Sequence, residues 1–226
     1  MTTVGRPRRG PVRGARDGRD VRWEAHRTER RRQLVEAALR AVRSHGAGVG
    51  MDEIAAEAGT SKTVLYRHLG DRTGLYRAVV EAVDGRILAD LAQARATSDD
   101  VVERIAAMVR SYLRLVEQDP EIYRFVMTRP LETTEVDPAD PVHQLTDRIA
   151  EQLGTILHEH LDTTGRPDAA VLAPLWGHMV VGMVRSASEH WLTRPGDTAQ
   201  DSETLTTAVV ALLRPALTRP QARTHP

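Results

Sequence analysis

Residues 50–83 read GMDEIAAEAGTSKTVLYRHLGDRTGLYRAVVEAV, and the predicted fold follows from this stretch. A short helix with two acidic residues in its first turn ends at Gly59, a residue that readily adopts the left-handed conformation of a helix end. Ser61 then caps a second short helix, because its hydroxyl can accept a hydrogen bond from a free N–H group. Asp71 offers the same cap to a long third helix. The pattern predicts a helix-turn-helix motif at about residues 51–70.

A helix-turn-helix motif needs a small residue where its helices touch, a glycine four positions later, and a branched apolar residue six positions after that. Ala55, Gly59 and Leu65 meet these requirements in order. The opposite side of the second helix carries hydrogen-bonding and amphipathic side chains, which suit the major groove and its flanking phosphates. The predicted DNA-binding residues are Thr60, Ser61, Lys62, Thr63, Tyr66, Arg67, His68 and, from the next helix, Arg72. Tyr66 and His68 have an alternative interpretation as packed hinge residues.

Lys62 is the only lysine of the chain, and the other thirty basic residues are arginines. The coding bias of a GC-rich genome explains the arginines, and under that interpretation the surviving lysine has no meaning. Its position favours a functional interpretation, because it opens the second helix of the motif, where free N–H groups and the helix dipole attract anions. A flexible ammonium group suits a phosphate better than it suits bidentate recognition of a base.

The composition favours an all-α protein. Of the 226 residues, 41% are hydrophobic and only 4% aromatic, and alanine, leucine and valine prevail over residues typical of strands. The absence of cysteine excludes disulfides, thiolate metal sites and a cysteine nucleophile. No apolar stretch is expected to reach the roughly 18 to 20 residues that span a bilayer, which predicts a cytoplasmic protein without a membrane partner.

Charge is distributed unevenly along the chain. Residues 1–90 contain 18 Lys and Arg against 12 Asp and Glu, whereas residues 91–226 contain 13 against 19. The first part is therefore expected to meet a polyanion, with an ordinary solvated surface as the alternative. Residues 1–22 are rich in Gly, Pro and Arg and predict a disordered basic arm. Its segment GRPRRG at 5–10 resembles the core of an AT-hook, although non-specific attraction to phosphate is the favoured interpretation.

Helical periodicity and capping residues predict about nine helices, with no convincing strand and no repeat of fixed period. The expected divisions are a helix-turn-helix domain at 23–90, a helical bundle at 91–218 and a disordered tail at 219–226. A polar loop is expected at 130–139. Later helices are expected to begin at Ser98 or Asp99, at Asp119 with Pro120, at Asp140 with Pro141, and at about Ser202.

Together with the amphipathic helix before it, the stretch quoted above resembles the DNA-binding region of the TetR family of bacterial transcriptional regulators. The resemblance covers about residues 28–90 and includes the SK opening and the LYRHL end of the second motif helix. Thr60 and Leu69 depart from the valine and phenylalanine usual in the family. The resemblance implies that Lys62 contacts phosphate or base edges, and that a homodimer binds near-palindromic double-stranded DNA.

The resemblance further implies that residues beyond about 95 enclose a small-molecule cavity and that the last two helices form the homodimer. The candidate pocket residues are Met108, Tyr112, Tyr123, Phe125, Met127, Trp176, Met179 and Met183. Each could instead fill a core. Phe125 lies two positions from both Tyr123 and Met127, so only one of these two sides can face a cavity. A mostly apolar lining favours a lipophilic effector. His178, Arg185 and His190 could orient a ligand or belong to an interface.

An enzymatic function has little support in the sequence. No zinc-protease, Walker or nucleophile-elbow motif occurs. His158 and His160 are two positions apart and point to different faces of a helix, which makes a poor metal pair. We therefore expect no catalytic residue, metal or cofactor. Since repression is the common mode of the family, the predicted function is a repressor released from its operator by a lipophilic effector. A dimeric DNA-binding protein without effector and a helical enzyme remain as alternatives.

Overall fold

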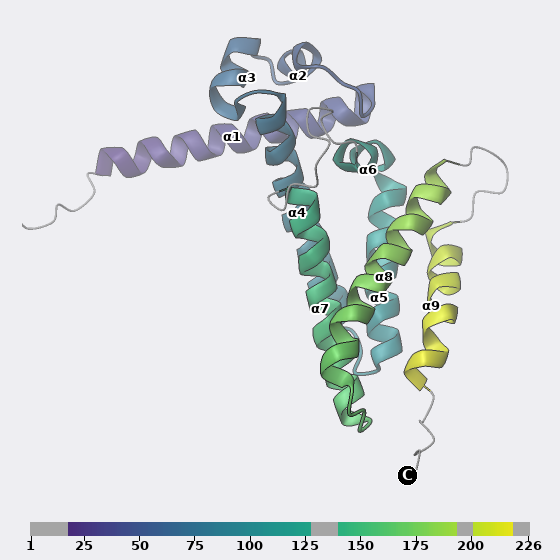
Figure 1. The fold of residues 1–226 in the computed structure, drawn as a ribbon. Coiled ribbons are helices and arrows are strands. Elements are labelled where there is room, and N and C mark those ends of the chain that lie inside the picture. Colours follow the sequence, from purple (N-terminus) through teal and green to yellow (C-terminus); the bar gives the residue numbers. More distant parts are fainter. Residues whose placement is uncertain (1–17, 128–139, 194–200, 219–226) are drawn as a thin grey trace, which may run out of the picture.

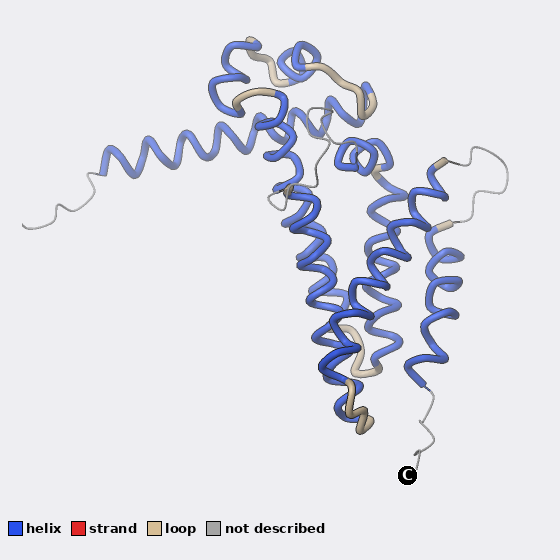
Figure 2. Tube along the Cα trace, in the orientation of Figure 1, coloured by secondary structure: helices blue, strands red, loops and turns tan. Residues whose placement is uncertain are grey.

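The structure, a computed structural model, describes residues 18–127, 140–193 and 201–218, and within these ranges every regular element is an α-helix (Figures 1 and 2). This confirms the predicted all-α class with about nine helices. The helices are α1 (Gly18–His45), α2 (Met51–Glu57), α3 (Lys62–Leu69), α4 (Arg72–Arg95), α5 (Val101–Gln118), α6 (Pro120–Met127), α7 (Pro141–Thr163), α8 (Ala169–Leu192) and α9 (Ser202–Thr218).

The first helix is longer than expected. Helix α1 begins at Gly18, so residues 18–22, which we expected in the basic arm, are helical. No proline follows Pro11 in this region, and arginine is a good helix former, so the helix can extend beyond its buried part. The rest of the predicted arm, the predicted loop at 130–139 and the tail at 219–226 lie outside the described residues.

Short polar side chains cap three of the helices, α3, α4 and α7, at the predicted positions. The Ser61 hydroxyl accepts from the Val64 amide, and the carboxylate of Asp71 accepts from the Gly74 amide at 2.8 Å. Asp140 accepts from the amide of Val142 at 2.9 Å. These bonds are local, which explains why sequence alone could identify them.

The start of α5 was predicted wrongly. Asp100 caps this helix by accepting from the Glu103 amide at 2.9 Å, whereas Ser98 accepts from the amide of Asp100. Several polar residues in a row can each serve as a cap. The choice among them depends on the apolar face, which places Val101 and Ile105 in the core and thereby sets where the helix begins.

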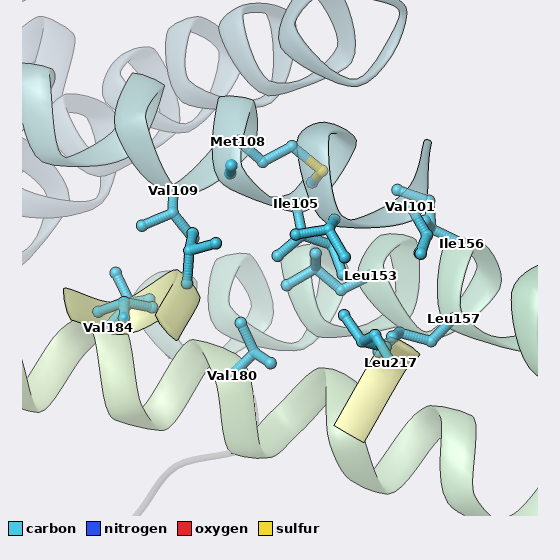
Figure 3. Close-up of a cluster of buried hydrophobic side chains, with 14 of the residues drawn as sticks. Val101, Ile105, Met108, Val109, Leu153, Ile156, Leu157, Val180, Val184 and Leu217 are labelled. Carbon is cyan, nitrogen blue, oxygen red and sulfur yellow. The ribbon is translucent and has the colours of Figure 1, made fainter. Parts of the chain in front are cut away.

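Two hydrophobic cores are stacked along the long axis of the molecule. The first core lies among α1–α4, where Leu34, Ile54 and Leu65 are buried, and it also receives one face of α6. The second core lies among α4, α5, α7, α8 and α9. Figure 3 shows Ile105 of α5, Leu153 of α7 and Val180 of α8 converging in it. Helix α4 crosses the predicted domain boundary at residue 90, so one continuous helix belongs to both cores.

Helices α7 and α8 form a closely packed hairpin. A Cβ atom on Gly177 of α8 would lie 2.3 Å from the carbonyl oxygen of Ala150 on α7. A Cβ atom on Gly154 would lie 3.3 Å from the Cα atom of Pro174. Glycine is therefore required at Gly177 because the two backbones touch there.

Helix α8 corrects the expectation that no segment is apolar enough to span a bilayer. It has 24 residues, a mean hydropathy of 1.2 over its most apolar window, and only 28% of that window buried within the chain. Polar residues such as His178 interrupt the apolar sequence of the helix but lower its mean hydropathy only slightly. Its inner face packs on α7, while Val171, Leu175 and Met179 are exposed on its outer face. Length and composition of this kind also occur in helices at the interfaces of soluble proteins.

Candidate DNA-binding surface and cavity

Helices α2 and α3 lie at the end of the molecule farthest from the α7–α8 loop (Figure 1). Ile54 and Leu65 are fully buried between them and α1. Gly59 has a φ of +58°, and the amide of Thr60 donates to the Ala55 carbonyl at 3.0 Å, which closes the turn. This packing fixes the orientation of α3 and leaves its opposite side facing solvent.

The predicted DNA-binding residues lie together on this end. Lys62, Thr63, Tyr66 and Arg67 are exposed on α3, and Arg72 is exposed at the start of α4. The remaining three are placed differently. Ser61 caps α3, whereas Thr60 is half-buried in the turn and His68 is half-buried near α1.

Lys62 is paired within the motif. Its ammonium group donates to the Asp52 carboxylate of α2 at 2.9 Å, and this bond raises the pKa of the lysine. Both side chains are largely exposed, so the pair contributes little to stability. A phosphate approaching α3 would therefore exchange with Asp52 at small cost. Sequence reasoning missed the contact because it crosses the turn between two helices.

His68 lies beside arginines of α1 that the sequence analysis did not include in the surface. Burial lowers the pKa of His68, and the positive charges of Arg67, Arg30 and Arg27 lower it further. The guanidinium group of Arg31 donates to the His68 carbonyl at 3.2 Å. The imidazole is therefore neutral at pH 7, and the positive charge here comes from arginine. The basic run at residues 30–32 was visible in the sequence, but only folding brings it to the end of α3.

A cavity lies below α6, between α4, α5, α7 and α8. It encloses about 1200 Å³ of space free of atoms, counting its open mouth. Of the candidate pocket residues, Met108, Tyr112, Tyr123 and Met127 line it. The other lining residues are mostly aliphatic, among them Ile87, Leu91, Val109, Leu115, Leu145, Ile149, Leu153, Val180 and Val184.

Four candidates lie elsewhere, and their predicted placement in the cavity wall is wrong. Phe125 points into the first core, with its ring 6.0 Å from that of Tyr76. Met179 is 61% exposed on the outer face of α8. Trp176 and Met183 are half-buried against the second core but do not border the cavity. The inner face of α8 carries valines, and the bulky side chains lie to either side of it. The size of a side chain therefore does not show whether it faces the cavity.

One end of the cavity is polar, and most of its charged residues were not predicted. The Arg43 guanidinium group of α1 makes two bonds to the Asp119 carboxylate, of 2.6 and 2.9 Å. Arg86 of α4 and Arg185 of α8 also line this end. The neighbouring rings of Tyr112 and Tyr123 meet edge to face with their centroids 6.5 Å apart, and the Tyr123 hydroxyl is buried beside Tyr112.

The histidines considered as ligands do not converge. His158 is exposed, and the Nε2 atom of His160 lies 2.9 Å from the carbonyl oxygen of Leu217 on α9. His178 and His190 are exposed on α8 outside the cavity wall, while Arg185 borders it. Among the described residues, no group of three or more His, Asp or Glu side chains is arranged to hold a metal ion.

Solved structures share this architecture. The fatty acid degradation regulator FadR from Bacillus halodurans superposes with a TM-score of 0.68 at 18% identity, covering 84% of this chain and 97% of that one. FadR from Bacillus subtilis, solved in complex with stearoyl-CoA, superposes with a TM-score of 0.67 at 16% identity, covering 84% and 98%. At these identities the likeness concerns the fold.

Sequence comparisons agree with the fold. An uncharacterized HTH-type transcriptional regulator of Mycobacterium tuberculosis is 35% identical over 181 residues, which cover 79% of this chain and 74% of the relative. The transcriptional activator FasR of Mycolicibacterium smegmatis is 37% identical over 122 residues, covering 54% and 52%.

Two family models match the chain in the order of its two cores. The model described as bacterial regulatory proteins of the tetR family matches residues 34–79, and the model described as a tetracyclin repressor-like C-terminal domain matches residues 90–225. The chain belongs to the TetR family of transcriptional regulators.

Proposed function

We propose that this regulator is a cytoplasmic repressor that binds a near-palindromic operator as a homodimer and leaves it when a lipophilic effector fills the cavity. The observation that carries the proposal is the double role of α6. Tyr123 and Met127 on one side of this helix border the cavity, whereas Phe125 on the other side is buried in the core beneath the helix-turn-helix motif.

The surface of α3 supports the DNA-binding part of the proposal. Lys62 and Arg67 offer positive charge, and Thr63 and Tyr66 offer hydroxyl groups, all from one exposed side of a helix that fits the major groove. Arg72 and the caps at the starts of α3 and α4 add donors at the margin of this surface. The proposed division of labour is phosphate contact by the lysine and base or phosphate contact by the remaining side chains.

The outer faces of α8 and α9 support the homodimer. Val171 of α8 and Leu212 of α9 are each 71% exposed, and Leu175 and Met179 of α8 are exposed as well. An apolar patch of this kind is costly in water and is typical of an interface. A two-fold dimer would bring two copies of α3 to two half-sites about one helical turn apart, or a small multiple of it.

A single charged side chain placed in this interface tests whether it forms the homodimer. Met179→Glu should yield a monomer in sedimentation at micromolar concentration, because the carboxylate would be buried against the partner. Glu203→Gln on an exposed turn of α9 changes charge outside the apolar patch and should leave the dimer intact. A wild-type protein that sediments as a monomer would contradict the proposed homodimer.

A mechanism of release follows from the contacts between α4 and α6. The Tyr76 hydroxyl of α4 donates to the Val126 carbonyl of α6 at 2.8 Å, and Phe125 packs beside the same tyrosine. An effector that displaces Tyr123 or Met127 would move α6 and, through Tyr76, the helix that carries the motif. A coupling of about 1–3 kcal/mol would change operator affinity roughly 5- to 150-fold. Helix α4 joins the two cores directly, and α6 supplies a second route between the cavity and the motif.

A lipophilic effector suits the lining of the cavity. Its wall is mostly aliphatic, with only a few polar and charged side chains. The stearoyl-CoA found with Bacillus subtilis FadR supports a long acyl group as one such effector for this fold.

The test is a gel-retardation titration of the DNA that flanks the regulator's own gene, with and without stearoyl-CoA. We expect a specific complex that stearoyl-CoA weakens at least fivefold. A ligand that binds without changing DNA affinity would favour a dimeric DNA-binding protein without effector. The likeness to FasR, an activator, favours activation as the second candidate, and a transcriptional reporter with and without the regulator decides between the two signs.

A further inference from the structure

Three arginines from three different helices border one end of the cavity. Arg43 of α1 is bound to Asp119, and Arg185 of α8 is bound to Glu189 at 2.9 Å. Arg86 of α4 has no ion pair or hydrogen bond from its side chain to any described residue. Arg86 is therefore a guanidinium group in the cavity wall that makes no direct ion pair with a described residue, although the charge of Asp119 is near enough to interact with it.

Arg86 and Arg43 both lower the pKa of the same carboxyl group, that of Asp119. The pKa of Asp119 is lowered first by the hydrogen bond from Arg43 and then by the charges of Arg43 and Arg86. Asp119, at the junction of α5 and α6, is thus paired with Arg43 and interacts with the charge of Arg86, and its side chain is 24% exposed. We call Arg43, Arg86 and Asp119 the head cluster.

The opposite end of the cavity is apolar. Met108 and Leu153 line the cavity away from the head cluster, and the α5 residues that line it between Met108 and Asp119 are all uncharged: Val109, Tyr112, Leu115 and Val116. Asp119, which caps the C-terminus of α5, follows Met108 by eleven positions, which corresponds to about 16 Å along the helix. The cavity is therefore elongated, with positive charge at one end and aliphatic side chains along the rest.

Resting on the proposed effector function, we propose that the ligand is an amphipathic anion, a long acyl chain with a carboxylate or phosphate head, and that Arg86 and Arg43 bind the head in exchange for Asp119. A guanidinium fork matches both kinds of head in a bidentate geometry. A neutral lipophile would gain only the apolar part of the wall. Because the cluster is open to solvent, its advantage for anions is modest, about tenfold.

The exchange at Arg43 reaches the DNA-binding domain. The bond between Arg43 and Asp119 joins α1 to the start of α6, and the amide of Ala47 donates to the Glu121 carboxylate at 2.9 Å beside it. A head group that takes Arg43 removes the stronger of these links. The anion therefore acts directly on the position of α1 relative to α6, in addition to the effect of the chain on Tyr123 and Met127.

The test compares three probes that share one chain: dodecanoate, dodecanoyl-CoA and dodecanol, each below its micelle concentration. Calorimetry on the full-length protein should give about tenfold tighter binding for at least one anion than for dodecanol. Arg86→Gln should abolish this advantage and leave dodecanol unchanged. Arg114→Gln removes the same charge from an exposed part of α5 outside the cavity and should change nothing. Asp119→Asn should tighten anion binding, because the competing carboxylate is gone.

The outcomes separate the two levels of the proposal. An advantage for dodecanoyl-CoA alone identifies the phosphates as the head, and an advantage for dodecanoate as well identifies the carboxylate. Equal affinity for all three probes, or an Arg86→Gln variant that behaves like Arg114→Gln, overturns the anionic head while leaving a lipophilic effector in place. Failure of all three probes to bind overturns the effector function itself.

Discussion

The two halves of this regulator differ in how completely each one fills its core. In the N-terminal half, Leu34, Ile54 and Leu65 are buried to 1% exposure or less, and the outer side of α3 is polar. In the C-terminal half, the core surrounds a cavity, and the outer face of α8 exposes Val171 and Met179. The core of the first half is filled, and its outer side is polar. The core of the second half leaves a cavity large enough to admit other atoms, and its outer side is apolar.

This difference suits two tasks. A surface that reads DNA must hold its side chains in place, and dense packing does so because shifted core side chains lose contacts. A sensor must have two arrangements of similar free energy, and an underfilled core permits them. The two halves meet at α4 and α6, where rigid packing and the cavity wall share the same helices.

The largest expected loss of stability comes from a substitution in the second half, where α7 and α8 pack most closely. Gly177→Ala should destabilise the protein by about 3 kcal/mol, because the new methyl group would lie 2.3 Å from the backbone oxygen of Ala150 and the two helices must separate. Urea unfolding measures the loss. Gly85→Ala on α4 meets no atom within 4 Å and should be neutral or slightly stabilising. Similar stabilities for the two variants would contradict the close contact of α7 and α8.

The next effect concerns the helix that joins the halves. Asp84 of α4 is 6% exposed and bonds Arg148 of α7. Burial raises the pKa of Asp84 from an ordinary 3.8 to about 6, although Arg148 opposes the shift. A raised pKa means that the folded protein holds the proton more tightly than the unfolded chain. The stability from this group is present below about pH 4 and is lost as pH rises to about 6.

Asp84→Asn removes this loss because the amide stays neutral. Above pH 6.5 the variant should be more stable than the wild type by about 2 kcal/mol, and the difference should close toward pH 4. Unfolding curves at pH 4.5, 5.5, 6.5 and 7.5 measure this difference. A constant offset over the whole range would show that Asp84 does not titrate as its burial requires.

The smallest effects would sharpen the description of the first half as a surface. Lys62→Ala should weaken operator binding by about 1 kcal/mol and lower its salt dependence by about one counterion, without changing stability by more than about 0.5 kcal/mol. Fluorescence anisotropy at several salt concentrations tests both. An unchanged salt slope would remove Lys62 from the phosphate contacts.

Asp52→Asn provides the matched measurement. It frees the same ammonium group without removing it, so DNA affinity should rise about twofold and the salt slope should stay at its wild-type value or increase. A loss of affinity would mean that Asp52 positions Lys62 for DNA instead of competing with it.

Much of the fold could be predicted from sequence because its determinants are local. The caps by Ser61, Asp71 and Asp140 need only residues within one turn, and the turn at Gly59 needs only a residue that tolerates a φ of +58°. Leu65 repeats at helical spacing with its neighbours, so its inward direction follows from the period alone. The same local pattern carried the resemblance to the family.

The cavity required tertiary structure, because periodicity identifies the faces of a helix but not what each face meets. Both faces of α6 are apolar, and only packing against Tyr76 assigned Phe125 to the first core and left Tyr123 and Met127 for the cavity. Met179 is exposed for the same reason, since α7 meets the face of α8 that carries Val180.

The charged residues also divide into features that are visible in the sequence and contacts that only folding creates. That Lys62 opens the second motif helix was visible in the sequence, since its place depends on the residues beside it. That it bonds Asp52, and that Arg43 of the first helix bonds Asp119 at 76 positions' distance, depends on how helices pack. Sequence by itself determined the helices, their ends and the motif, because those interactions act within a few residues. Only the tertiary structure decided which faces enclose the cavity and which charges meet at its mouth, because those contacts join segments that are distant along the chain.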